Sequence, residues 1–106
     1  MASRNVKKTE LGLYEHTIMR AVEAKWQKEC HRYADRLLPG QLTMAFFVNE
    51  RGRVVEMNPI DENAGSAIQR GITLKAIKTA TIPTMPRKLR VSQQGQPVEV
   101  VITFNF

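Results

Sequence analysis

The end of the chain, residues 97–106, limits most strongly what this sequence can fold into. Its apolar side chains recur at every second position: Val98, Val100, Ile102, Phe104 and Phe106. The positions between them carry Glu99, Val101, Thr103 and Asn105. Period two indicates a β-strand with one apolar face. A strand buries such a face only within a sheet that a second layer covers. The rest of the chain must therefore supply the other strands of the sheet and the layer that covers them.

Two further segments read as strands joined in a hairpin. Apolar side chains occupy every second position over residues 42–48. Residues 49–52 are turn-forming, and Gly52 can take a positive φ. Residues 53–57 return as the second strand of the hairpin. Pro59 ends that strand nearby, because proline cannot donate a hydrogen bond to a ladder.

Two segments show helical periodicity. We predict that the first is capped by Thr9 and ends at Pro39-Gly40. Its apolar side recurs at steps of three, four or seven residues, through Leu11, Tyr14, Ile18, Val22, Trp26, Tyr33 and Leu37. Trp26 keeps this spacing, so we expect it to anchor the core. The second helix is predicted from residue 63 to about 80, with capping side chains at 61–63. Residues 81–87 are expected to form an extended loop, and 91–96 a turn.

The predicted order is therefore helix, strand, strand, helix, strand. Three strands with an apolar face and two helices to cover it predict a two-layer α+β domain, with a three-stranded antiparallel sheet packed against two helices. The length of 106 residues fits one domain, which we place at 9–106. Residues 1–8 are expected to be a disordered tail or the cut end of a longer protein. If the first strand, the most apolar, is central, the last strand lies on an edge.

The sequence offers no constellation for catalysis. Cys30 is followed by His31, but adjacent helical residues point about 100° apart, and no third group is suggested. A zinc site needs several closely spaced Cys or His ligands, which the chain lacks. The glycines at 65, 71 and 95 fit no phosphate-binding loop. We therefore predict a protein that is not an enzyme and uses no metal and no cofactor.

The chain has a net charge of +6, and the placement of the charge matters more than its size. Residues 63–98 hold six basic side chains and no acid: Arg70, Lys75, Lys78, Arg87, Lys88 and Arg90. Such a stretch can attract an acidic partner, a lipid head group or nucleic acid. Nucleic-acid sites interleave aromatic and basic residues, and this stretch has no aromatic residue. Phe47 is the one strand aromatic that could stack on a base, and burial under a helix explains it equally well. We expect no nucleic acid as partner and keep this class as the alternative function.

The last strand is the most informative feature for function. An edge strand exposes unpaired N–H and C=O groups, to which another chain can add a strand. The same edge can instead be capped or pair with a second copy of the chain. Self-association through this strand therefore remains a further alternative.

Four pieces in order resemble the C-terminal domain of the TonB/TolA energy-transducer family. They are Ile18, Val22 and Trp26 at helical spacing, the turn Asn49 to Val54, the helix end Ala76-Ile77 with Ile82 to Pro86, and the close Gly95 to Phe104. The resemblance covers about residues 14–106. The chain departs from the family where Asp61 to Gly65 replaces a Ser-Ser-Gly turn, and its first helix begins early, as in TolA-like members. The branch, TonB-like or TolA-like, stays open.

The resemblance implies a periplasmic module, tethered to the inner membrane in the full-length protein. Its partners would be a peptide of an outer-membrane transporter or other envelope protein, and inner-membrane motor proteins through an N-terminal segment. The peptide would add to the last strand, mainly through backbone atoms of Pro97, Val98, Glu99, Val100, Val101, Ile102 and Thr103. Arg87, Lys88 and Arg90 would steer an acidic partner.

Overall fold

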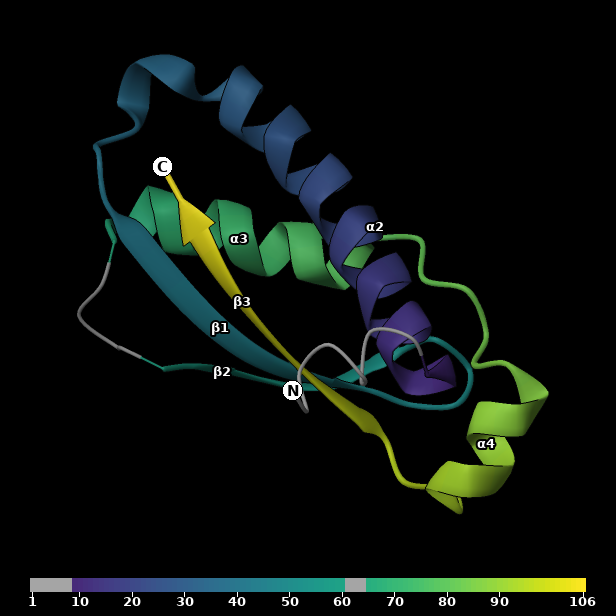
Figure 1. Cartoon of the computed structure of the whole chain (residues 1–106). Helices are drawn as coiled ribbons and strands as arrows, with labels where there is room; N and C mark the ends of the chain where they lie inside the picture. The colour runs from purple at the N-terminus through teal and green to yellow at the C-terminus, as the bar shows by residue number, and fades with distance from the viewer. Residues whose placement is uncertain (1–8, 61–64) are drawn as a thin grey trace.

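A computed structural model describes residues 9–60 and 65–106 of the chain. The elements follow in the order α2 (Glu10–Arg32), η1 (Ala34–Arg36), β1 (Gln41–Val48), β2 (Val54–Pro59), α3 (Ala67–Thr79), α4 (Arg87–Gln93) and β3 (Val98–Asn105). The three strands form one antiparallel sheet, and α2 and α3 lie together on one side of it (Figure 1). The predicted α+β class, with a three-stranded antiparallel sheet packed against helices, is confirmed. The predicted tail at 1–8 lies outside the described residues.

Helix α2 begins at its predicted cap and ends earlier than predicted. The Thr9 side-chain oxygen accepts a hydrogen bond from the backbone N–H of Gly12 at 3.1 Å. The helix stops at Arg32 because Tyr33 leaves helical geometry, with φ −112° and ψ 26°. The single 3-10 turn η1 follows before the chain enters β1. Apolar spacing continues through Leu37, which is why the sequence overstated the length of the helix.

The β1–β2 hairpin matches its predicted turn chemistry. The Asn49 side-chain oxygen accepts hydrogen bonds from the backbone N–H groups of Arg51 and Arg53, both at 3.0 Å. Gly52 takes a φ of +80°, in the left-handed region that favours glycine. The register shifts between Phe47 and Val48, which marks an irregularity in the ladder.

Helix α3 is capped by a residue that the sequence interpretation passed over. The Ser66 side chain accepts a hydrogen bond from the N–H of Gln69, and the Gln69 side chain accepts one from the N–H of Ser66. This reciprocal capping box satisfies two backbone donors at the start of a helix. Gly65 has a φ of +73°, so the chain is not helical at that residue. The predicted start at 63 is therefore wrong, and the capping side chains predicted at 61–63 lie outside the described residues.

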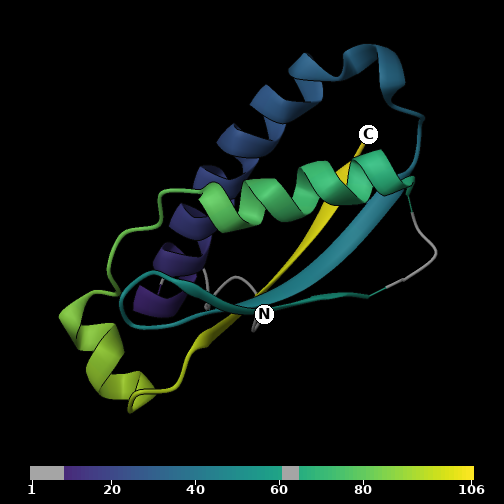
Figure 2. The same ribbon diagram turned by 180° about the vertical axis from the view of Figure 1, so that it is seen from behind.

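The short helix α4 replaces part of a predicted loop. It spans Arg87–Gln93 and so includes the end of the segment predicted as extended, at Arg87, and the start of the predicted turn, at residues 91–93. Leu89 is buried and joins the core, whereas the other α4 side chains are largely exposed. A helix this short, with one buried side chain, has no apolar periodicity from which it could be predicted. Figure 2 shows α4 at the end of the sheet where the β1–β2 hairpin turns.

The core lies between the sheet and its helices. It is formed by alternate residues of β1 and β3 together with Tyr14, Ile18, Val22, Ile77, Met85 and Leu89. Trp26 packs against this core, as predicted. Its ring centroid lies 5.3 Å from that of Phe104 and 5.0 Å from that of Phe106. Its indole N–H donates to the Thr73 hydroxyl at 3.2 Å. Trp26 thereby connects α2 to α3 and to the end of the sheet.

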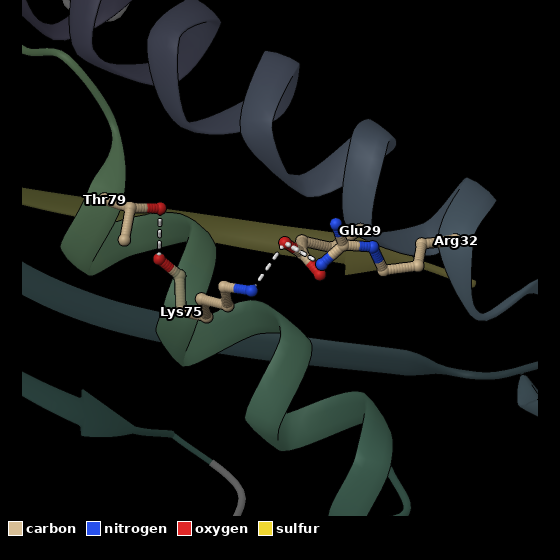
Figure 3. Close-up of polar contacts among 4 residues, drawn as sticks. All are labelled: Glu29, Arg32, Lys75 and Thr79. Atoms are coloured by element: carbon tan, nitrogen blue, oxygen red, sulfur yellow. Dashed lines mark hydrogen bonds and ion pairs between the residues drawn. The ribbon is translucent and has the colours of Figure 1, made fainter.

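An ion pair also joins the two long helices. The Lys75 ammonium on α3 lies 3.0 Å from the Glu29 carboxylate on α2, and Arg32 approaches the same oxygen at 3.8 Å (Figure 3). The Glu29 side chain is 15% exposed, whereas that of Lys75 is 51% exposed. The exposed partner keeps this pair in the range of surface ion pairs, of about 0.5–1 kcal/mol.

We expect Lys75→Met to lower the free energy of unfolding by about 0.5–1 kcal/mol, because Glu29 loses its nearest cation. Urea titrations at low and high salt measure the loss, which salt should reduce. Lys78→Met is the matched control, since Lys78 lies on the same helix and none of the ion pairs seen in residues 9–60 and 65–106 includes it. Equal losses in the two variants would contradict a role for the pair.

Candidate functional site

The strand order is β2-β1-β3, so β3 lies on an edge of the sheet. The most apolar strand, β1, is central, which is the condition under which the last strand was expected to lie on an edge. β3 pairs with β1 along its whole length, from Val48 opposite Val98 to Gln41 opposite Asn105. Within the part of the chain that the structure describes, no segment pairs with the other side of β3.

The ladder shows which backbone groups of β3 face outward. Residues of an antiparallel strand alternately direct both their N–H and C=O to one neighbour. The Phe106 N–H donates to the Gly40 carbonyl at 2.8 Å, which extends the β1–β3 register by one pair. The even-numbered residues of β3 therefore bond to β1. Outward-facing backbone groups belong to the odd-numbered residues, here called the free edge: Glu99, Val101, Thr103 and Asn105.

The opposite edge, formed by β2, is less suited to accept a strand. The Ile60 N–H donates to the Thr43 carbonyl at 3.0 Å, so Met57 and Pro59 direct their backbone outward. Pro59 has no N–H to offer, and the irregularity at Phe47/Val48 distorts the pairing. β3 has neither proline nor register shift. Of the two edges, only that of β3 presents an uninterrupted row of donors and acceptors.

The predicted site residues divide into two groups. Val98, Val100 and Ile102 turn their side chains toward the helices and their backbone groups toward β1. Glu99, Val101 and Thr103 lie on the free edge and have exposed side chains. Pro97 precedes β3 and is not part of it. Of the predicted residues 97–103, three therefore direct their backbone groups away from β1, and Asn105 does so as well.

A groove that the sequence did not predict runs beside this edge. It has a volume of about 450 Å³ and lies between the first half of α2 and β3. Leu13, Glu15, His16 and Met19 line it from α2, and Val100 and Val101 from β3. Leu13 and Val101 are among the most exposed large apolar side chains, at 56% and 52%. Burial raises the pKa of the Glu15 carboxyl. We call this feature the α2 groove.

The three predicted steering residues lie on α4, outside the α2 groove. Arg87 and Arg90 border a shallow depression together with Glu50 and Val91, on the side of the hairpin. Lys88 is exposed on the same helix. Elsewhere in the basic stretch, Lys75 is paired with Glu29. The basic residues are thus divided between α3 and α4.

The outer face of the sheet corrects the prediction for Phe47. Its neighbour Phe46 is buried beneath the helices, and Phe47 points to the other face, where it is only partly buried. Burial under a helix therefore does not explain Phe47. Its cross-strand partners are Glu56 on β2 and Glu99 on β3. Two carboxylates beside Phe47 would repel phosphate groups brought to this part of the sheet.

Glu15 and His16 are the titratable side chains that line the α2 groove. Burial and the neighbouring Glu29 raise the pKa of the Cys30 thiol, which keeps it protonated and weakly nucleophilic. Residues 9–60 and 65–106 contain no cluster of three or more His, Cys, Asp or Glu side chains that could hold a metal ion. No helix in the described part of the chain has the length and apolar character needed to cross a membrane.

Comparison with known proteins leaves the family of the chain open. No protein-family model matches it, and no curated protein has a matching sequence. The free edge and the α2 groove are therefore the features from which a function can be inferred.

Proposed function

We propose that this domain is a binding module that takes up an extended segment of another protein as a fourth strand on β3. The observation that carries the proposal is the free edge, which offers outward N–H and C=O groups on alternate residues from Glu99 to Asn105. Strand addition uses such main-chain groups for affinity. The competing edge on β2 is shorter and ends in Pro59, which has no N–H to donate.

The resemblance to TonB/TolA C-terminal domains supports a more specific role. As a module of an energy transducer, the domain would hold a peptide of an outer-membrane transporter or other envelope protein. Motor proteins of the inner membrane would act through an N-terminal segment. A ladder of backbone hydrogen bonds suits a protein that transmits a pulling force, because several of these bonds share the load and must break together. The cationic α4 would raise the association rate of an acidic partner.

We expect Val101→Pro to weaken peptide binding at least tenfold, or about 1.4 kcal/mol. The substitution removes an outward N–H and places the proline ring at the edge, while the ladder to β1 keeps all its bonds. Linear peptides selected from a phage-displayed random library are the probe, and calorimetry measures their affinity. Val101→Thr is the control, because it changes the side chain and retains the N–H.

Hydrogen exchange provides an independent readout. A bound peptide should slow exchange of the Val101 and Thr103 amides and leave that of Met57 on β2 unchanged. Equal affinity for Val101→Pro and the parent protein would exclude the edge as the site. The transducer role is tested separately by fractionating source cells with an antibody to the domain. A cytosolic location would refute that role and leave strand addition intact.

A further inference from the structure

The free edge and the α2 groove adjoin one another along β3. Val101 contributes to both, since its backbone groups face outward and the residue lines the groove. Leu13 and Met19 on α2 form the opposite apolar wall and are 56% and 39% exposed. Large apolar side chains left open beside an unpaired strand indicate an interaction surface.

The geometry of a sheet determines where the side chains of an added strand would go. Residues directly opposite each other on neighbouring strands point to the same face. A segment residue opposite Val100 or Ile102 would therefore point to the helix side of the sheet, where α2 stands. A residue opposite Val101 would point to the outer face. Only every second side chain of the segment can thus enter the α2 groove.

We propose that the α2 groove selects the partner, by accepting apolar side chains at the two segment positions opposite Val100 and Ile102. This inference rests on the strand addition proposed above and adds what the partner must contain. The partner is an extended segment with the pattern apolar-x-apolar. Leu13 and Met19 are the residues of α2 that determine this preference.

The charges around the groove exclude acidic residues from these two positions. Glu15 lines the groove, so its carboxylate would repel a second anion placed beside it. The basic residues of α4 do not line the groove. An acidic residue in the segment is therefore tolerated outside the two inward positions.

The groove leaves room for a segment longer than these two positions. A second depression of about 390 Å³ continues along α2 from His16 and Met19 to Glu23 and Gln27. Helix α2 and β3 run in the same direction, because Met19 and His16 share the groove with Val100, and Trp26 packs on Phe104. Residues of the segment beyond the apolar pair would meet polar side chains there.

The decisive experiment reads the sequences of selected peptides. Linear random peptides displayed on phage are panned against the domain, and the residues at alternate positions are compared. We expect apolar residues two apart and a deficit of Asp and Glu at the same positions. We also expect Leu13→Glu and Met19→Glu to weaken binding of the selected peptides about tenfold or more.

Leu38→Glu provides a matched control, because Leu38 is also an exposed leucine, at 64%, and does not line the groove. This variant should bind the peptides as the parent does. Far-UV circular dichroism of all variants confirms that the fold is kept. A glutamate near the N-terminus of α2 is favourable to the helix dipole, so Leu13→Glu should fold.

The outcomes separate the two proposals. Peptides that protect the Val101 and Thr103 amides, yet show no apolar alternation and bind Leu13→Glu normally, overturn the groove inference and leave strand addition standing. Failure to select any peptide, or peptides that protect none of these amides, overturns both. A dimer in light scattering, with these amides already protected without peptide, assigns the edge to a second copy and also overturns both.

Discussion

Replacing Gly52 with alanine is expected to destabilise the domain by about 3 kcal/mol or more. Gly52 combines a φ of +80° with a close approach to the loop before α4. A Cβ at this position would lie 2.5 Å from the Ile82 carbonyl oxygen and 2.7 Å from that of Pro83. Both are backbone atoms, so the hairpin and the loop must separate. Their separation strains the hydrogen bond from the Met85 N–H to the Glu50 carbonyl, 2.9 Å long.

Gly95 supplies the control that isolates the steric part. It has the same φ of +80°, but a Cβ there would meet no heavy atom within 4 Å. Gly95→Ala should therefore cost only the backbone strain, about 1–2 kcal/mol. Urea denaturation of both variants measures the difference. If the two alanine variants lose the same stability, the hairpin does not pack on residues 82–83 as described.

The arrangement of the sheet followed from the side-chain pattern. A central position for β1, the most apolar strand, was the condition for an edge position of the last strand, and the structure meets it. The even-numbered residues of β1 between Leu42 and Val48 are buried, as their alternation predicted. The direction of the backbone groups of the last strand could not be predicted. It depends on the register between β1 and β3, and side-chain alternation alone does not set that register.

The missed features depend on tertiary contacts. α4 is held by the single buried side chain of Leu89, which gives no periodic signal. Two polar residues of α3, Gln69 and Thr73, can be buried because the side chain of each donates a hydrogen bond to a backbone carbonyl. The Gln69 amide donates to the Leu38 carbonyl at 2.8 Å, and the Thr73 hydroxyl donates to the Gln69 carbonyl at 2.8 Å. A sequence pattern shows polarity and cannot show such partners.

The α2 groove was missed for a related reason. Leu13 and Met19 lie off the apolar stripe that packs on the core, so they read as isolated surface residues. They border the free edge because α2 lies over β3 while α3 lies toward β2. The positions of the two helices over the sheet depend on how the helix layer packs on the strands. One signal in the sequence could have pointed to them. Leu13 and Met19 are two large apolar side chains of the first helix that lie outside its core-facing stripe.

Replacing Trp26 with alanine is expected to cost about 3 kcal/mol of folding free energy. The substitution removes two aromatic contacts, with Phe104 and Phe106, and the hydrogen bond to Thr73. It also removes the link between α2 and the C-terminal end of β3. A domain of this size has a total stability of about 5–15 kcal/mol, so the loss is a large share. Because Trp26 is the one tryptophan of the chain, unfolding should be followed by far-UV circular dichroism.

Trp26→Phe divides this loss into its parts. The smaller phenyl ring keeps an aromatic face toward the two phenylalanines but lacks the donor to Thr73 and part of the indole volume, so about 1–2 kcal/mol should be lost. The difference between the alanine and phenylalanine variants then measures the aromatic packing, for which two pairs at these centroid distances predict about 1–3 kcal/mol. A loss of folding free energy in Trp26→Ala smaller than the loss expected for Trp26→Phe would mean that other contacts hold α2 over β3. The wall of the groove would then not depend on this anchor, and peptide affinity would survive the substitution.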